Sequence, residues 1–200
     1  MRRQEDTPRS HVAEKIQHAV AQAKSTVCDK RREGFSLSSV RRHNKNMVKK
    51  MEINKITQNK EQFMDLLLLG DEQENMIKKY LYRGELFALY DGDLKTVSVV
   101  TKEDETICEI KNIATYEKYH GKGYGKIMIK YIIENFKDKC KILLVGTGEN
   151  AKIISFYKNC GFVYSHTVKG FFVNNYDHKI FEDGKQLRDM IYLKMEFTGE

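Results

Sequence analysis

The sequence has few cysteines, a single proline, no tryptophan and no long apolar stretch. The cysteines, at positions 28, 108, 140 and 160, lack both the paired CxxC spacing of zinc sites and the pattern of disulfide-rich secreted domains. The longest nearly continuous apolar runs span 63–69 and 142–145, far short of the roughly 18 residues of a membrane span. The charged start lacks the apolar segment of a secretory signal. We therefore expect reduced thiols, no metal site, no membrane contact and a cytoplasmic location.

The composition is that of a folded protein. Of the 200 residues, 40% are hydrophobic and 10% aromatic, while 32% are charged. A wholly disordered chain has a lower share of hydrophobic residues, which excludes that class. Chains usually split into several domains only beyond roughly 250 residues. The sequence therefore predicts one domain, or one domain with an appendage.

Positive charge is concentrated near the amino terminus. The formal net charge is +7, yet residues 1–50 contain 13 Lys or Arg against 5 Asp or Glu, whereas residues 51–200 contain 22 against 23. Residues 1–50 also have too little apolar surface to offset the entropy of ordering. We predict a basic extension over 1–50, disordered or partly helical around 11–24, followed by a folded domain over 51–200.

Two interpretations of the extension stay open. In the first, its basic side chains contact the phosphates of nucleic acid or the carboxylates of an acidic partner. In the second, the extension is a solvated tail.

Strand and helix signals alternate from position 51 onward. They predict strands over 51–57, 84–90, 94–101, 106–115, 142–145, 162–168 and 189–197, and helices over 58–69, 71–82, 150–160 and from 124 onward. Asp91-Gly92-Asp93 predicts a hairpin turn, because Gly and Asp tolerate positive φ. The apolar run 142–145 predicts a central strand, which forms a parallel βαβ unit with the preceding strand and helix.

A glycine-rich stretch lies between a predicted strand and a predicted helix. It reads His120-Gly121-Lys122-Gly123-Tyr124-Gly125-Lys126. Glycines let the backbone approach a ligand closely, and the helix N-terminus adds partial positive charge. The spacing matches neither the Walker A loop nor GxGxxG. The stretch indicates a diphosphate site, with the two lysines either adding charge or merely solvated; a flexible connection without a ligand is the alternative.

The stretch resembles the phosphate loop of the GNAT superfamily of acyl-CoA-dependent N-acetyltransferases, which reads Gln/Arg-x-x-Gly-x-Gly/Ala. Here it is His120-x-x-Gly123-x-Gly125, preceded by Asn112-Ile113-Ala114 at the end of a strand. A second family element, an Asn followed seven residues later by a Tyr and then a Gly-Phe pair, is present as Asn150, Tyr157 and Gly161-Phe162. The resemblance covers about residues 51–197 and is to small bacterial-type members of undefined substrate.

The resemblance implies an α/β fold: a mixed, mostly antiparallel sheet with a central parallel βαβ unit that binds acetyl-CoA, and flanking helices. Acetyl-CoA is implied as co-substrate, without a metal ion. Backbone groups of 113–115 are implied to hold the thioester, and Asn150 the pantetheine arm. The full set of implied cofactor-binding residues is Ile113, Ala114, Thr115, His120, Gly121, Lys122, Gly123, Tyr124, Gly125, Lys126 and Asn150.

The resemblance also implies two catalytic residues. Tyr157 matches the tyrosine that protonates the coenzyme A sulfur in many members, and a phenol with a pKa of about 10 keeps its proton until a thiolate forms nearby. Glu109 lies where members with a glutamate base carry it; an aliphatic amine, with a pKa of roughly 10.4, must lose a proton before attack. The alternatives are a core role for Tyr157, a structural pair of Glu109 with Lys111, and ordered water as the base.

The implied reaction transfers an acetyl group from acetyl-CoA to a primary amine by direct attack in a ternary complex. A small-molecule amine stands ahead of a protein lysine or N-terminus as the acceptor. Residues 171–190 form a long aromatic and acidic connection of the kind that often borders the acceptor site in this superfamily. Asp177, Glu182 and Asp183 are suited to attract a cationic amine, and Phe171, Phe172 and Tyr176 to pack on its body.

Alternatives to this interpretation also stay open. In the simplest alternative, residues 171–190 form an ordinary surface hairpin. In a second, the whole protein is a regulator that binds acetyl-CoA without catalysis. In a third, it is a protein associated with nucleic acid. The sequence leaves the acceptor and the oligomeric state, which includes a homodimer, undecided.

Overall fold

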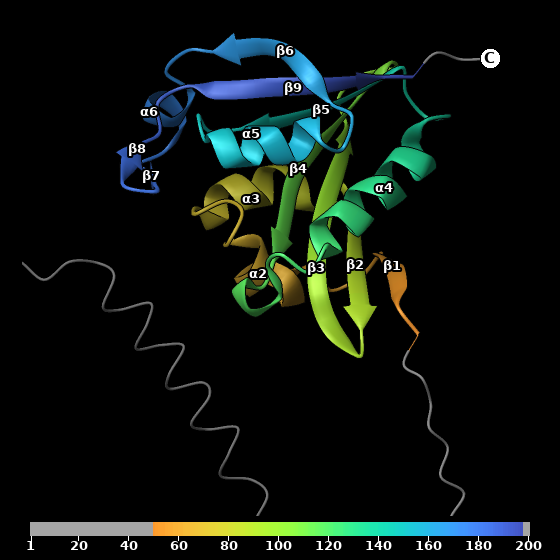
Figure 1. Ribbon diagram of the computed structural model, residues 1–200. Coiled ribbons are helices and arrows are strands. Elements are labelled where there is room, and N and C mark those ends of the chain that lie inside the picture. The colour runs from red at the N-terminus through yellow and green to blue at the C-terminus, as the bar shows by residue number, and fades with distance from the viewer. Residues whose placement is uncertain (1–49, 198–200) are drawn as a thin grey trace, which may run out of the picture. The chain divides into compact units, whose positions relative to one another are not determined.

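The computed structural model describes residues 50–197 (Figure 1). One seven-stranded sheet runs, in spatial order, through β1 (Glu52–Ile56), β2 (Glu85–Asp91), β3 (Asp93–Lys102), β4 (Ile107–Thr115), β5 (Ile142–Thr147), β9 (Met190–Glu196) and β6 (Val163–Val168). A small pair is formed by β7 (Phe181–Glu182) and β8 (Lys185–Gln186). The helices are η1 (Lys60–Phe63), α2 (Met64–Leu67), α3 (Glu74–Leu81), η2 (Glu117–Tyr119), α4 (Tyr124–Phe136), α5 (Ala151–Lys158) and α6 (Phe171–Asn175), of which η1 and η2 are 3-10 helices. The extension predicted over 1–50, with its helix at 11–24, falls outside the described residues except for its last position.

The first half of the sheet is an antiparallel meander of β1 to β4. The predicted hairpin joins β2 to β3 across Asp91–Asp93, and Gly92 takes a φ of 81°, a conformation that costs glycine little. The four strands predicted between positions 51 and 115 are therefore confirmed, with ends that differ by a residue or two.

The second half contains the predicted βαβ unit. β4 and β5 pair in parallel, and α4 connects them. Met128, Ile129 and Ile132 recur at helical spacing on α4 and are fully buried. β9 then pairs with β5 in antiparallel orientation, so that β6 becomes the edge strand. The structure is thus the predicted mixed, mostly antiparallel sheet with one parallel pair.

Helices cover both faces of the sheet (Figure 1). On β2, Phe87 and Leu89 join the core under α4 and α5, whereas Leu86 and Ala88 join the core under η1, α2 and α3. Alternate residues of a strand point to opposite faces, so both sets must be apolar when both faces are covered. Cys108 and Cys140 are free thiols in the first of these cores.

Two helical segments differ from the prediction. The helix expected over 58–69 is broken into η1 and α2, and it starts after Asn59, whose φ of 50° interrupts any continuous helix. The connection over 171–190 contains α6, which the sequence analysis did not predict, and the β7–β8 pair, which agrees with the hairpin offered there as an alternative. Both segments are short, and short elements depend on tertiary packing more than on periodicity.

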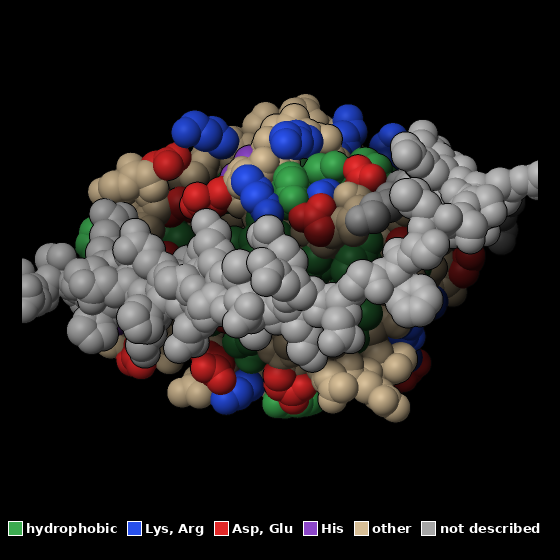
Figure 2. Space-filling model, turned by 90° about the horizontal axis from the view of Figure 1, so that it is seen from below, with side chains coloured by type: hydrophobic (Ala, Val, Ile, Leu, Met, Phe, Trp, Pro, Cys, Tyr) green, Lys and Arg blue, Asp and Glu red, His purple; other side chains and the backbone are tan. Residues whose placement is uncertain are grey.

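Charge on the described part is mixed. Figure 2 shows acidic and basic side chains side by side on the face that it draws, which agrees with the near balance of charge counted over residues 51–200. None of the helices within 50–197 combines the length and apolarity needed to cross a bilayer.

Candidate functional site

The sheet opens between β4 and β5. The two strands pair only as far as Ile110 and Val145; beyond these residues β4 continues to Thr115 along β3, and β5 continues to Thr147 along β9. A bulge in β4 leaves Lys111 without a partner on β3, and a bulge bends its strand and increases the local twist. The main chain of β4 beyond the bulge therefore faces an opening instead of a neighbouring strand.

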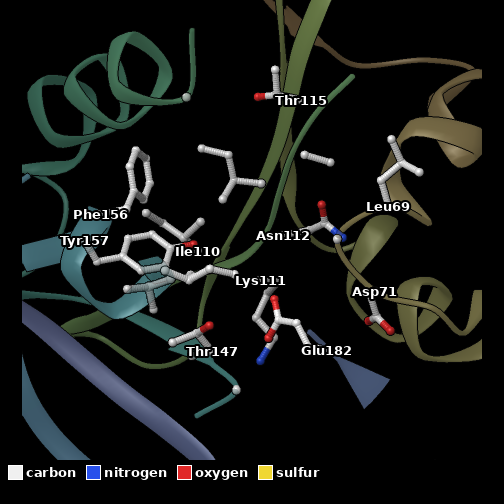
Figure 3. Close-up of a pocket in the computed structure, with 18 of the residues that line it drawn as sticks. Leu69, Asp71, Ile110, Lys111, Asn112, Thr115, Thr147, Phe156, Tyr157 and Glu182 are labelled. Atoms are coloured by element: carbon white, nitrogen blue, oxygen red, sulfur yellow. The ribbon is translucent and has the colours of Figure 1, made fainter. Parts of the chain in front are cut away.

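This opening leads into a cleft of about 1120 Å³ (Figure 3). Sites for single small ligands usually measure about 300–1,000 Å³, so the cleft is large enough for a sizeable cofactor together with a small acceptor. Most of the residues singled out in the sequence line it: Glu109, Ile113, Ala114, Thr115, His120, Gly121, Gly123, Tyr124, Gly125, Lys126 and Tyr157. Lys122 and Asn150 do not line it.

The glycine-rich loop presents backbone donors to the cleft. Gly121 and Gly123 have φ of 73° and 87°, and a side chain at either position would extend into open space. Gly123 precedes α4, and the first intrahelical bond runs from Ile127 N to Gly123 O at 3.0 Å. The amides of 124–126 therefore have no acceptor within the helix, and they point out of its N-terminus together with its partial positive charge. Such an end binds anions readily.

His120 connects the loop to the end of β4. Its Nε2 donates to the carbonyl of Thr115 at 2.8 Å, because a carbonyl oxygen only accepts. The side chain that replaces the usual Gln or Arg thus fixes the loop against the strand beside the opening.

The β2–β3 hairpin braces the loop from the other side, a feature that the sequence analysis missed. Tyr124 donates to Asp91 at 2.8 Å, and both Tyr119 and Lys95 bind Asp93. Lys95 is only 5% exposed, and its Nζ lies 3.9 Å from the centre of the Tyr119 ring. Hydrogen bonds from Lys95, then from Tyr119, lower the pKa of Asp93 to about 2. The only signal in the sequence is the pair of carboxylates flanking Gly92, which the pattern indicates as turn residues.

Tyr157 belongs to the core and to the cleft wall at once. It is 5% exposed, and its ring packs edge-on against Phe156 and Phe162, with ring centres 5.2 and 6.0 Å away. Burial raises the pKa of Tyr157, so the phenol keeps its proton at neutral pH. Figure 3 shows Tyr157 and Phe156 on one side of the cleft and Asp71 on the other.

Glu109 lies on β4 immediately before the opening. Its side chain is mostly buried and forms an ion pair with Lys111, with Nζ and Oε1 3.0 Å apart. Both residues line the cleft. Burial, followed by the charge of Glu109, raises the pKa of Tyr192 on β9. The pair with Lys111 that the sequence analysis offered as the alternative to a catalytic base therefore occurs, and it lies in the wall of the cleft.

Asn150 and Lys122 have partners outside the cleft. Asn150 caps α5: its Oδ1 accepts from Lys152 N at 2.9 Å, and its Nδ2 donates to Asp183 at 3.4 Å. The ammonium of Lys122 lies 5.3 Å from the centre of the Tyr119 ring. In this conformation neither side chain reaches the cleft.

The end of the cleft away from the phosphate loop is aromatic and acidic. Of the residues predicted there, Phe171, Phe172, Tyr176 and Glu182 line the cleft. Asp177 and Asp183 do not; they pair instead with His178 at 2.5 Å and with Lys152 at 3.2 Å.

Asp71, between α2 and α3, lines this end of the cleft but was missed in the sequence. Tyr176 donates to it at 3.1 Å across 105 positions of the chain. No sequence signal distinguishes Asp71 from the neighbouring Glu72, because its environment comes from a segment far along the chain.

Comparisons with known proteins agree with this geometry. A family model described as an acetyltransferase (GNAT) domain matches residues 83–164. YvbK of Bacillus subtilis, described as an uncharacterized N-acetyltransferase, is 36% identical over 153 residues, which cover 74% of this chain and 98% of that protein.

Several solved structures have about the same sequence identity to this chain as YvbK has. A GNAT family acetyltransferase from Elizabethkingia anophelis with acetyl-CoA bound has a TM-score of 0.70 and 36% identity, covering 73% of this chain and 97% of that one. A Bacillus subtilis acetyltransferase in complex with CoA has a TM-score of 0.69 and 35% identity, with coverages of 74% and 100%. An IAA acetyltransferase from Bacillus cereus has a TM-score of 0.69 and 34% identity, with coverages of 74% and 99%.

Proposed function

Since this chain belongs to the GNAT family of acetyl-CoA-dependent N-acetyltransferases, we propose that it acetylates a primary amine of a small molecule, by direct attack of the amine on acetyl-CoA in a ternary complex. One observation carries the proposal. The opening between β4 and β5 and the donors at the N-terminus of α4 belong to a single cleft. That cleft offers a strand edge for the pantetheine arm and amides for the diphosphate.

The cleft fits acetyl-CoA. A diphosphate needs close approach to the main chain and several donors, and the open space at Gly121 and Gly123 with the unpaired amides of 124–126 supplies both. Lys126 also lines the cleft. The main chain of 111–115, which has no neighbouring strand on the β5 side, is suited to the amides and the thioester of the pantetheine arm. The relatives crystallised with acetyl-CoA and with CoA support this assignment.

Tyr157 is the proposed acid. When the neutral amine forms its bond to the acyl carbon, the carbon–sulfur bond breaks and the sulfur leaves as a thiolate. The buried phenol donates a proton to that sulfur, the acylated nitrogen gives up its remaining extra proton to water, and the phenol recovers a proton from water. Its raised pKa keeps the proton in place until the thiolate develops.

Glu109 is the proposed base, acting directly or through an ordered water. The acceptor arrives as an ammonium ion and must lose a proton before its nitrogen attacks. Glu109 lines the cleft at the point where β4 leaves β5, and the pair with Lys111 holds its carboxylate in place. The proton passes from the ammonium to the carboxylate and then to water.

A small acceptor is favoured by the bridge across the acceptor end. The hydrogen bond from Tyr176 to Asp71 joins the segment after α6 to the loop before α3, and His178 lies 4.0 Å from Glu72 beside it. These contacts narrow the acceptor end of the cleft, which a lysine or N-terminus of a protein substrate would have to enter. The IAA acetyltransferase relative is consistent with a small acceptor.

The test combines binding and transfer. Titration calorimetry with acetyl-CoA measures cofactor affinity, and thiol release in the presence of an amine panel measures transfer. We expect saturable acetyl-CoA binding and amine-dependent thiol release with a small primary amine. Binding without release by any amine would favour a regulator, release only with peptide lysines or N-termini would favour a protein acetyltransferase, and absence of binding would refute the proposal.

A further inference from the structure

We infer that the acceptor carries a second cationic group besides the amine that is acetylated, and that Asp71 binds this group at the far end of the cleft. The class of acceptor is thus a diamine or another compound with a cation at a distance from its reacting nitrogen. This inference rests on the proposed function, because it names the acceptor of the same site.

Asp71 accepts hydrogen bonds from neutral donors. Tyr176 donates to Oδ1 at 3.1 Å, Tyr80 donates to Oδ2 at 3.2 Å, and the amide of Gln73 adds a longer bond of 3.4 Å to Oδ1. A carboxylate has about four acceptor positions, so Oδ2 retains capacity for a ligand. Within residues 50–197, no Lys, Arg or His lies within ion-pair distance of Asp71.

The direction of the hydrogen bonds shows that the wall is built to present an acceptor. Asn112 Nδ2 donates to the Tyr80 oxygen at 3.1 Å and to the carbonyl of Leu67 at 3.0 Å. Tyr80 has one proton, and it gives that proton to Asp71. Asn112 is 4% exposed, and its Oδ1 has no partner among the described residues. The wall therefore has more hydrogen-bond acceptors, in Asp71 and Asn112, than donors to satisfy them. An ammonium group, with three donors and no acceptor, complements it.

A second carboxylate faces the same end. Glu182 on β7 lines the cleft, and it too lacks an ion-pair partner in the described part of the chain. Figure 3 shows Asp71 and Glu182 on the side of the cleft away from Thr115, and thus away from the phosphate loop. Burial is the largest influence on both carboxyls and raises the pKa of each, and the charge of Lys79 offsets only part of this effect at Asp71.

Two of the three cations that line the cleft near this end are paired with carboxylates: Lys111 with Glu109 at 3.0 Å and Arg83 with Glu103 at 2.8 Å. The third, Lys79, donates to the neutral sulfur of Met76 at 3.0 Å and lies beyond ion-pair distance of Asp71, although, against the effect of burial, its charge lowers the pKa of Asp71. None of these pairs neutralises Asp71 or Glu182. A partly buried carboxylate without a counter-ion costs free energy, and a bound cation offsets that cost.

Aromatic side chains complete this part of the cleft. The rings of Phe171 and Phe172 lie 5.5 Å apart, and that of Tyr176 lies 5.6 Å from Phe172. Such a wall packs on a methylene chain and attracts a cation through its ring faces. Tyr176 belongs both to this wall and to the contacts of Asp71, so it places the apolar and the charged parts of the subsite side by side.

The experiment compares diamines with monoamines of equal length. Diaminobutane and diaminopentane are set against butylamine and pentylamine, with wild type, Asp71→Asn and, as a matched control, Asp177→Asn, which removes an exposed carboxylate outside the cleft. For wild type and Asp177→Asn we expect kcat/KM about tenfold or more higher for the diamines. For Asp71→Asn we expect that preference to disappear, so that the diamine and the monoamine of equal length show kcat/KM values within about twofold of each other.

Binding separates this inference from the proposed function. Calorimetric titration of each amine into enzyme saturated with CoA requires no turnover. Tighter binding of the diamines to wild type than to Asp71→Asn supports the inference even if no transfer is seen, whereas equal binding of diamines and monoamines to wild type overturns it. Failure to bind acetyl-CoA refutes the proposed function instead.

A second variant allows the same test if Asp71→Asn does not fold. If Asp71→Asn does not melt cooperatively, Glu182→Gln is measured with the same amines, since Glu182 lies on the short β7–β8 pair outside the main sheet. A loss of diamine preference of at least about threefold supports the inference, and an unchanged preference contradicts it.

Discussion

Tyr157 is buried among aromatic rings, and this burial sets its chemistry. The sequence placed it by its spacing from Asn150, but only the fold shows that the hydroxyl-bearing ring lines the cleft. A buried phenol with a raised pKa keeps its proton, and is therefore neutral, at any physiological pH.

Tyr157→Phe removes the proposed proton donor while keeping the ring. We expect kcat to fall about 10²-fold or more, the usual contribution of a general acid, and KM for acetyl-CoA to stay within about twofold. Steady-state kinetics with a responsive amine measures both. Tyr164→Phe, at an exposed position on β6, is the control and should retain wild-type rates; an equal kcat in both variants would remove Tyr157 from the mechanism.

Gly123 is the loop residue with the largest positive φ, so a substitution at this position strains the backbone most. Its φ of 87° is costly for any residue with a Cβ, by about 1–2 kcal/mol. In Gly123→Ala we expect the loop to relax toward negative φ and turn its amides from the cleft, which weakens acetyl-CoA binding about tenfold or more by calorimetry.

Gly184→Ala is the matched control for this change. Gly184 has a φ of 79° and open space around it, like Gly123, but it lies in the turn between β7 and β8. The two variants should lose similar thermal stability, while Gly184→Ala binds acetyl-CoA as wild type does. Equal loss of affinity in both would show that strain alone, and not the phosphate loop, is responsible.

At the scale of elements, the β2–β3 hairpin holds the phosphate loop in position. Lys95 is buried between Asp93 and the Tyr119 ring, and Tyr124 at the start of α4 binds Asp91. The hairpin does not line the cleft, so its effect on the cofactor acts through these tyrosines. The arrangement makes Lys95 a positioning residue.

Lys95→Met tests this bracing. We expect KM for acetyl-CoA to rise about threefold to tenfold, because the loop loses an ion pair and a cation–ring contact, while kcat changes by less than about twofold. Lys102→Met, on the same strand but exposed and paired only with Glu105, should leave both constants unchanged. A fall in kcat with an unchanged KM would contradict a role in positioning the cofactor.

At the scale of the molecule, several buried tyrosines share one response to pH. Burial raises the pKa of Tyr80, Tyr157, Tyr176 and Tyr192. The unfolded chain releases phenolic protons near pH 10, whereas the folded chain retains them, so the folded state binds more protons above that pH. The free energy of unfolding must then fall as pH rises.

We therefore expect alkaline destabilisation. The urea midpoint should be nearly constant between about pH 8 and about pH 9 and should fall between about pH 10 and about pH 11. Tyrosinate absorbance of the folded protein over the same range checks the cause, since these four tyrosines should remain protonated until unfolding. A midpoint that is unchanged or higher at about pH 11 would contradict the assignment.

Much of the fold was predictable because it depends on local pattern. The hairpin at Asp91–Asp93, the amphipathic helix after Gly123 and the apolar strand at 142–145 follow from residue spacing, and the structure confirms each. The short elements η1, α2 and α6 were not predictable, since a helix of four or five residues is stabilised by its neighbours and not by its own sequence.

The sequence by itself determined the family, through two motifs that resemble those of the GNAT superfamily, and this resemblance supplied the candidate residues Glu109 and Tyr157, because a motif is a local property of the chain. Only the tertiary structure decided which carboxylates share the cleft. Asp71 and Glu182 both line it, while Asp177 and Asp183 pair with His178 and Lys152. The reason is physical: the contact of Asp71 with Tyr176 joins positions 105 residues apart, and a side chain's burial and partners depend on packing between distant segments, which no local pattern encodes.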